Sequence, residues 1–321
     1  MQRVEMEALK KAKELLSNGT VNRVLGWQKG EFCYDVSPCV FESVEELDNF
    51  IYNGFCGANL CKYLIAESKK EGKILVFLKP CDSYGFNELV KEHRINKDNV
   101  YVVAIECQGK FDIEKFHQNG IEFVNSIEET STTVKVNNAK EFIRDDFKLE
   151  RCLVCNKKHT YYDELIEFEE KLPAKQDRFD MVHKLEAMTP DERFAFWKKE
   201  LSKCIRCNAC RNVCPACTCI KCVFDNDNST ISSKANADSF EEKLFHIIRS
   251  FHVAGRCTDC GECSRVCPQN IPLHLLNRKY IDDINNLYGE YQAGEDSSSR
   301  GPLINYNKED KDPSDAIGGN K

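Results

Sequence analysis

The chain has 321 residues, of which 41% are hydrophobic and 30% charged, and its formal net charge is −7. This length predicts roughly two domains, and the acidic balance argues against nucleic acid or an anionic membrane surface as the main partner. No apolar run approaches the ~20 residues that span a bilayer, and residues 1–16 lack the apolar core of a signal peptide. We therefore expect a cytoplasmic protein without a membrane span.

The first part of the chain alternates strand and helix patterns, which predicts an α/β domain with a partly parallel sheet. An amphipathic helix is expected at 4–16, ended by Asn18-Gly19. Further helices are expected at residues 43–50, 60–70 and 84–93, and strands at 21–27, 32–41, 74–78 and 100–105. The last two strands are continuous apolar runs, typical of strands buried on both faces.

The second part is predicted to be mainly helical. Thr189 and Glu192 form a capping-box pattern around Pro190 at the start of one helix. Helices are expected at residues 163–172, 190–202, 240–251 and 273–288, with a polar linker at 225–238. The predicted domains are therefore an α/β domain at 1–160, a mainly helical domain at 161–290 and an extended tail at 291–321.

Cysteine is unusually frequent, with 19 residues in the chain, 11 of them between Cys204 and Cys267. A cytosolic compartment keeps thiols reduced, so this usage favours metal ligation or redox chemistry over disulfides. The strongest pattern is a run of four cysteines followed by proline, which occurs twice. The two copies are Cys204-x2-Cys207-x2-Cys210-x3-Cys214-Pro215 and Cys257-x2-Cys260-x2-Cys263-x3-Cys267-Pro268.

This spacing is that of bacterial two-cluster ferredoxins, in which three cysteines of each run bind one 4Fe-4S cluster and the fourth ligates the other cluster. One predicted set is therefore Cys204, Cys207, Cys210 and Cys267. The other is Cys257, Cys260, Cys263 and Cys214. Structural zinc is the alternative, although zinc sites usually show two cysteine pairs per ion. The long spacer between the runs favours a helical ferredoxin type over a compact one.

Three cysteines follow the first run, namely Cys217, Cys219 and Cys222. They are interpreted either as additional ligands or as small buried apolar residues, and no role is assigned to them.

A third group of cysteines is suggested by the predicted sheet. Cys81 and Cys107 each follow a buried strand, and the carboxyl ends of parallel strands are where α/β sheets place ligands. Cys152-x2-Cys155 supplies two more thiols, so the four would form either a third cluster site or a zinc site with four cysteine ligands. Cys33, Cys39, Cys56 and Cys61 are interpreted as core or spare thiols.

Several stretches resemble the beta-subunit family of deazaflavin-reducing hydrogenases and formate dehydrogenases, in the form with a carboxy-terminal two-cluster ferredoxin domain. The resemblance covers most of residues 20–290. The matching stretches are Val24-Leu-Gly-Trp27, Phe55-Cys-Gly-Ala-Asn-Leu-Cys-Lys-Tyr-Leu64, Leu78-Lys-Pro-Cys-Asp-Ser83, Ile105-Glu-Cys-Gln-Gly109, Arg151-Cys-Leu-Val-Cys155, residues 204–219 and residues 252–263.

The resemblance implies that Cys81, Cys107, Cys152 and Cys155 bind a third 4Fe-4S cluster. It also implies a bound FAD, although the sequence has no Gly-x-Gly-x-x-Gly loop and no P-loop. In this family the beta subunit passes electrons between a flavin or deazaflavin site and a partner's catalytic centre.

The predicted function is therefore an iron-sulfur electron-transfer subunit. It would relay electrons between a flavin or ferredoxin partner and the catalytic subunit of a formate dehydrogenase, hydrogenase or heterodisulfide-reductase-like complex that also holds a flavoprotein subunit. No zinc-protease motif and no nucleophile elbow suggest another reaction centre. The alternative is an FAD-containing oxidoreductase that acts directly on a deazaflavin or nicotinamide coenzyme.

Overall fold

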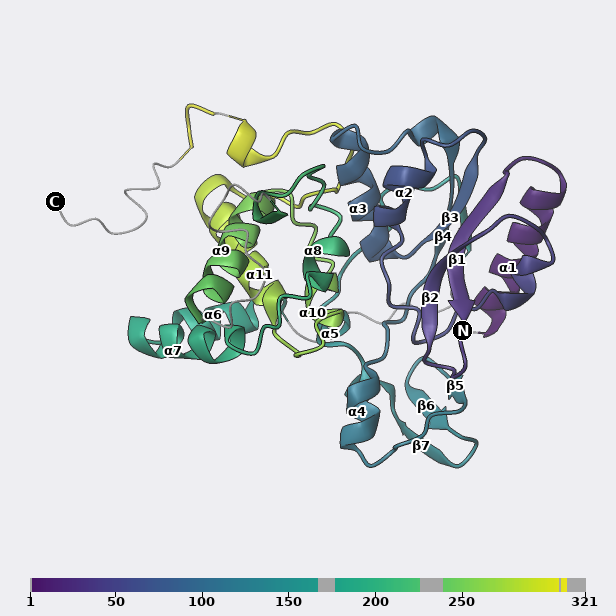
Figure 1. Ribbon diagram of the computed structural model, residues 1–321, viewed down its shortest axis with the longest axis horizontal. Helices are drawn as coiled ribbons and strands as arrows, with labels where there is room; N and C mark the ends of the chain where they lie inside the picture. Colours follow the sequence, from purple (N-terminus) through teal and green to yellow (C-terminus); the bar gives the residue numbers. More distant parts are fainter. Residues whose placement is uncertain (1, 167–176, 226–238, 306, 311–321) are drawn as a thin grey trace. The chain divides into compact units, whose positions relative to one another are not determined.

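The computed structural model describes residues 2–166, 177–225, 239–305 and 307–310 (Figure 1). The chain forms two compact units, residues 1–177 and 178–321, and each is described by itself.

The first unit is built on a five-stranded sheet with the strand order β2-β1-β3-β4-β8. The strands are β1 (Arg23–Lys29), β2 (Val36–Phe41), β3 (Ile74–Leu78), β4 (Val100–Ile105) and β8 (Glu164–Ile166). β2 is antiparallel to β1, whereas β1, β3, β4 and β8 run parallel to one another. The prediction of an α/β region with a partly parallel sheet is therefore confirmed.

Helices cover both faces of this sheet (Figure 1). The helices near the sheet are α1 (Gln2–Ser17), α2 (Cys61–Glu67) and α3 (Pro80–Lys91). α1 contacts β1 and β8, and it buries an apolar stripe at helical spacing, Val4, Ala8, Ala12 and Leu15. α3 contacts β3 and β4. Every residue of β3 is buried, as predicted for a strand covered on both faces.

Several predicted boundaries were wrong. The helix expected at 84–93 begins at Pro80, so Cys81 lies in the first turn of α3 and not in a loop before it. Proline suits this position because the first helical N–H has no intrahelical partner. The helix expected at 43–50 is only the 3-10 turn Glu46–Asn49, and the strand expected from residue 32 begins at Val36.

The helix expected at 163–172 is wrong where the structure describes it, because Glu164–Ile166 forms β8. This strand pairs with β4, whose edge would otherwise expose unpaired backbone groups, and the pairing overrides local helix propensity. Residues 167–172 of that prediction lie outside the described residues, as does most of the linker expected at 225–238.

A small three-stranded sheet in the first unit was not predicted from the sequence. Its strands are β5 (Ile127–Glu129), β6 (Thr133–Val136) and β7 (Lys140–Ile143), and α4 (Ile113–Gln118) and the short helix α5 (Glu150–Leu153) lie before and after it in the chain. Its apolar residues pack with phenylalanines, including Phe116 and Phe147, in a core separate from that of the large sheet.

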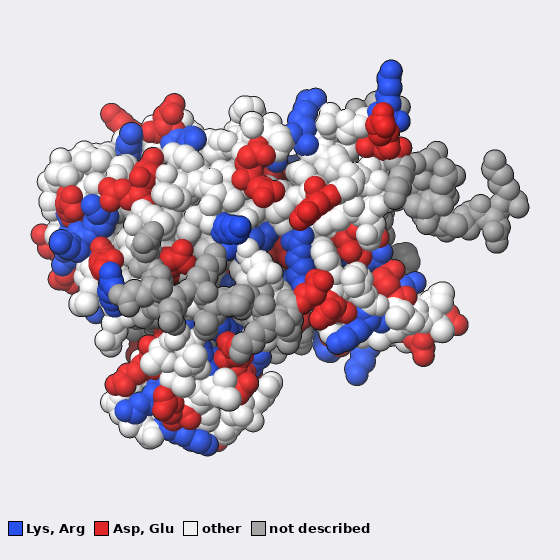
Figure 2. All heavy atoms as spheres, turned by 180° about the vertical axis from the view of Figure 1, so that it is seen from behind, with Lys and Arg blue, Asp and Glu red and all other residues white. Residues whose placement is uncertain are grey.

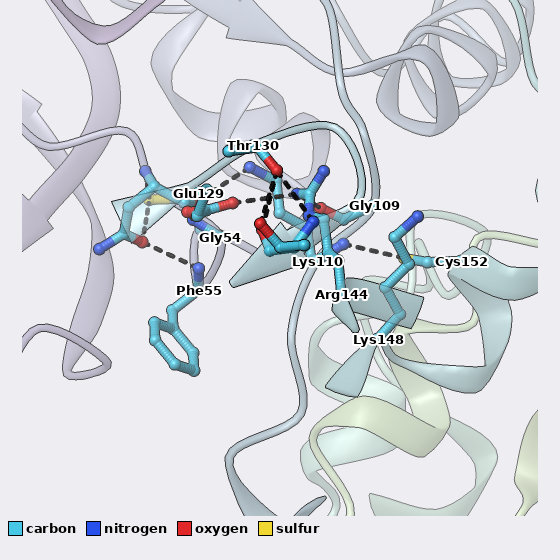
Figure 3. Close-up of polar contacts among 12 residues, drawn as sticks. Gly54, Phe55, Gly109, Lys110, Glu129, Thr130, Arg144, Lys148 and Cys152 are labelled. Atoms are coloured by element: carbon cyan, nitrogen blue, oxygen red, sulfur yellow. Dashed lines mark hydrogen bonds and ion pairs between the residues drawn. The ribbon is translucent and has the colours of Figure 1, made fainter. Parts of the chain in front are cut away.

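A buried ion pair joins this small sheet to the loop after β4 (Figure 3). One carboxylate oxygen of Glu129 lies 3.0 Å from an Arg144 Nη2 that also donates to the carbonyl of Gly109, at 3.2 Å. The other carboxylate oxygen of Glu129 accepts from the N–H of Gly54 at 2.7 Å. Both charged side chains are almost fully buried. The pair therefore fixes three segments that meet beside the loop of Cys107.

The helices of the second unit are α6 (Asp180–Glu186), α7 (Pro190–Leu201), α8 (Ala209–Asn212), α9 (Ser239–Val253), α10 (Glu262–Arg265) and α11 (Leu273–Tyr288). The predicted capping box at the start of α7 is present: Thr189 Oγ1 accepts from the N–H of Glu192, and the Glu192 carboxylate accepts from the N–H of Thr189.

Acidic and basic side chains are interspersed over the face seen in Figure 2. Among the described residues of that face, the Lys and Arg side chains do not form the extended basic stripe that is typical of nucleic-acid-binding proteins. No helix in the described part of the chain is both long enough and apolar enough to cross a membrane.

We predict that Glu129→Ala lowers the free energy of unfolding by about 3–5 kcal/mol, because it leaves the buried Arg144 guanidinium without its carboxylate. The neighbouring Glu128 is the matched control, since its side chain is 58% exposed and lies 3.8 Å from Lys135. Glu128→Ala is expected to change stability by less than about 1 kcal/mol. Urea denaturation monitored by fluorescence checks both values, and equal effects would contradict the structural role given to Glu129.

Candidate metal centres

The two cysteine runs of the second unit fold into loops with the same backbone conformation. In the first loop, Arg206 and Asn208 adopt positive φ angles of 54° and 62° on either side of Cys207. In the second, Asp259 and Gly261 adopt 54° and 66° on either side of Cys260. A four-residue helix follows each loop directly, α8 in one case and α10 in the other, and these two helices pack together. The sequence repeat is therefore also a structural repeat.

This conformation directs backbone N–H groups towards the thiols. The N–H of Arg206 donates to Cys204 Sγ at 3.4 Å, and the N–H of Asp259 makes the equivalent hydrogen bond to Cys257. Left-handed residues that alternate with right-handed ones turn successive N–H groups to one side, which makes the concave anion sites used by many iron-sulfur centres. The donor set and the backbone of both loops therefore fit such a cluster.

Four thiols predicted as one ligand set line a single pocket of the second unit. They are Cys214, Cys257, Cys260 and Cys263, and Thr258, Gly261 and His274 are among the other lining residues. Cys214 comes from the first run and the other three from the second. Cys214 and Cys257 also pack with Val253 of α9 in one small apolar cluster. The fourth cysteine of the first run thus lies with the three of the second.

The thiols of the other predicted set gather at the opposite end of the same helix. Cys204, Cys210 and Cys267 pack in the apolar cluster that contains Phe245 of α9, and Cys263 of the second run also belongs to this cluster. Cys207 is exposed, but its thiol and that of Cys267 interact electrostatically with Cys210. Burial raises the pKa of Cys210 to about 11. Iron binds the deprotonated thiolate. A buried thiolate is costly without a neighbouring positive charge, so this position suits a thiolate that is bound to iron.

Two polar residues of α9, which sequence reasoning did not identify, lie against the thiols. His246 Nε2 lies 3.2 Å from Cys204 Sγ, and burial followed by the charge of Arg249 lowers the pKa of His246 to about 3. The neutral imidazole can therefore donate a hydrogen bond to this sulfur. Arg249 is 3% exposed, and its charge acts on Cys263, Cys210 and Cys214. His246 and Arg249 are three residues apart, so the sequence could have indicated that they share one face of the predicted helix.

In the first unit, Cys81 and Cys107 follow the adjacent parallel strands β3 and β4, as predicted. Cys152 lies on α5 and Cys155 just beyond it. The four are linked electrostatically, since the thiol of Cys155 interacts with Cys152 and Cys107, and that of Cys81 with Cys155. Burial, then the neighbouring Cys152, raises the pKa of Cys155 to about 11.

Hydrogen-bond donors and cations surround this group of four. The backbone N–H of Lys110 donates to Cys152 Sγ at 3.4 Å (Figure 3). The ammonium groups of Lys79 and Lys110 are buried beside it, 4.4 Å and 3.8 Å from the ring centres of Trp27 and Tyr52. Lys79 also pairs with the Asp82 carboxylate at 2.8 Å. Positive charge next to four thiols suits an anionic cluster.

The remaining cysteines have other surroundings. Cys56 and Cys61 are fully buried in the core of the large sheet, where Cys61 Sγ donates to the carbonyl of Asp82 at 2.8 Å. Cys33 and Cys39 are half-buried, and Cys33 Sγ donates to the Val124 carbonyl. Of the three that follow the first run, Cys217 packs beside Cys214, Cys219 is exposed and Cys222 packs in the cluster of Phe245.

Within the described ranges, no three His, Cys, Asp or Glu side chains converge closely enough to hold a metal ion.

Comparison with known proteins gives one family match and several relatives. Residues 200–271 match the family model described as a 4Fe-4S dicluster domain. The F420-dependent formate dehydrogenase subunit beta of Methanocaldococcus jannaschii is 27% identical over 357 aligned positions, which cover 91% of this chain and 92% of that protein. The F420-dependent formate dehydrogenase 1 subunit beta of Methanococcus maripaludis is 25% identical, covering 67% of this chain and 72% of that one.

A solved chain of the F420-reducing NiFe hydrogenase complex of Methanosarcina barkeri has 16% identity and a TM-score of 0.36, and the match covers 47% of this chain and 62% of that chain. The two formate dehydrogenase relatives and the dicluster match confirm the resemblance noted in the sequence. The chain is therefore similar to the beta subunits of F420-dependent formate dehydrogenases, and residues 200–271 of its second unit match a 4Fe-4S dicluster domain.

Proposed function

We propose that this chain is the iron-sulfur electron-transfer subunit of an F420-dependent formate dehydrogenase or hydrogenase complex in the cytoplasm. It would relay electrons between a flavin or ferredoxin partner and the catalytic subunit. The observation that carries the proposal is the pair of cysteine loops with one backbone conformation, together with the pocket in which the fourth cysteine of the first run joins three cysteines of the second.

Two clusters are assigned to the second unit. Cys204, Cys207, Cys210 and Cys267 would hold one, and Cys257, Cys260, Cys263 and Cys214 the other. The pocket lined by all four thiols of the second set supports this crossed assignment. The first set is supported by the apolar cluster in which Cys204, Cys210 and Cys267 pack together, a cluster that Cys263 of the second set also joins. The exchange also ties the two loops together, because each cluster would need a ligand from both.

We assign a third cluster to Cys81, Cys107, Cys152 and Cys155 of the first unit. Two observations support this assignment. The four thiols interact electrostatically with one another at the ends of two parallel strands. The buried ammonium groups of Lys79 and Lys110 also lie beside them. A zinc site with the same four cysteine ligands is the competing assignment.

When bound, 4Fe-4S clusters accept and release one electron at a time. The protein would control that process through hydrogen bonds to sulfur, nearby charge and burial. Arg206 and Lys110 supply backbone donors to thiols, His246 supplies a ring nitrogen, and the apolar residues Phe245 and Val253 exclude water beside the two sets of the second unit. The names of the two formate dehydrogenase relatives support the choice of complex.

The first experiment is metal and flavin analysis of protein purified without air from its native host. We expect about 12 iron atoms per chain, because three sets of four thiolates would each hold one four-iron cluster. Co-purifying subunits would identify the reaction, and loss of flavin absorbance on addition of a reduced deazaflavin would favour a direct oxidoreductase. Zinc in place of iron would overturn the proposal.

The crossed assignment is tested by a matched pair of variants, Cys267→Ala and Cys214→Ala. Each should damage the cluster held by the three cysteines of the other run, because the fourth ligand is exchanged. Electron paramagnetic resonance that resolves the clusters checks which signal is lost. If each variant instead lost the cluster of its own run, the assignment would be wrong.

The third site is tested by Cys155→Ala, with Cys39→Ala as the control. Cys39 is a half-buried thiol of the same unit that packs against the core of the large sheet. We expect Cys155→Ala to lower the iron content by about four atoms per chain, and Cys39→Ala to leave it unchanged. Loss of one zinc atom with full iron retention would establish the zinc alternative.

A further inference from the structure

A buried guanidinium on α9 has no hydrogen-bond partner within the described residues. Arg249 is 3% exposed, and its Nε, Nη1 and Nη2 atoms all lack a partner there. A buried charge without compensation is strongly destabilising. Arginine presents five donors in a planar fork and stays charged. The side chain therefore calls for an anion that can accept several N–H bonds.

The position of Arg249 on α9 shows which anions are within reach. Phe245, one turn before it, packs in a cluster with Cys204, Cys210 and Cys267 of the first set and with Cys263 of the second. Val253, one turn after it, packs with Cys214 and Cys257. Residues four apart lie on the same face of a helix, so Arg249 occupies the middle of a face that contacts both cysteine sets.

Electrostatic contacts agree with this placement. The thiols that act on Arg249 are Cys263, Cys210, Cys214 and Cys217. Cys210 belongs to the first proposed cluster, whereas Cys214 and Cys263 belong to the second. Cys217 packs beside Cys214.

We propose that Arg249 is a shared tuning residue, whose guanidinium donates hydrogen bonds to sulfurs of both clusters of the second unit and raises both reduction potentials. The inference rests on the proposed function, since it requires both clusters. A cube with four thiolates is a net anion and becomes more negative on reduction. A fixed cation and N–H donors next to its sulfurs therefore stabilise the reduced form more than the oxidised form.

The test is a redox titration of the anaerobically purified full chain, monitored by electron paramagnetic resonance, after its iron content has been measured. Arg249→Gln should lower the equilibrium constant for reduction of both clusters at least tenfold, which is about 59 mV for a one-electron couple. Arg249→Lys should lower both potentials less, because an ammonium keeps a charge but loses the planar fork.

Arg193→Gln is the control for the removal of a positive charge. Arg193 lies on α7 of the same unit and pairs with Glu186 at 3.2 Å, so both potentials should stay at the wild-type values. Unchanged potentials in Arg249→Gln, or a shift of one cluster only, would overturn the inference. If Arg249→Gln loses iron, the potentials of Arg249→Lys are used instead, and unchanged potentials or a shift of one cluster only in that variant would overturn the inference. Wild-type protein without two clusters would overturn the proposed function instead.

Discussion

The second unit depends on how the buried face of one helix, α9, packs against the thiols of both cysteine runs. Phe245 and Val253, two turns apart on α9, each pack against cysteines of both runs. Under the proposed crossed assignment, neither loop would form its ligand set alone, and the assembly of one site would require the other. The long spacer between the runs ends in α9, which supplies this shared surface.

The first unit places thiols by a different physical route. Parallel pairing of β3 with β4 brings the ends of two strands to one edge of the sheet, and Cys81 and Cys107 follow those ends. Cys152 and Cys155 reach the same edge from a distant segment, where the N–H of Lys110 donates to Cys152 Sγ. Arg144, which pairs with Glu129, donates to the carbonyl of Gly109 in the loop after β4. The small sheet thus supports the loop of Cys107.

Buried cations recur beside the cysteine groups of both units. Lys79 and Lys110 lie near the first, and Arg249 near the other two. Burial lowers the pKa of Lys110. Burial acts in the same direction on Lys79, but the neighbouring Asp82 and Cys81 outweigh it and raise the pKa of Lys79 above its usual value. Removing such charges from water is costly even where, as for Lys79, a carboxylate lies beside the ammonium group. Their cost is offset where they face bound anions, which links stability of the apoprotein to occupancy of the sites.

The sequence alone determined the features that are local or periodic. The apolar runs of β3 and β4, the amphipathic pattern of α1 and the capping box at Thr189 could each be predicted because neighbouring residues decide them. The cysteine spacing likewise predicted a dicluster domain, which the family match confirms. Only the tertiary structure decided β8, which forms because β4 has an open edge, and the roles of Glu129 and Arg249, whose partners lie far away in the chain. Long-range pairing and burial leave no periodic trace in the sequence, and so these features required the folded chain.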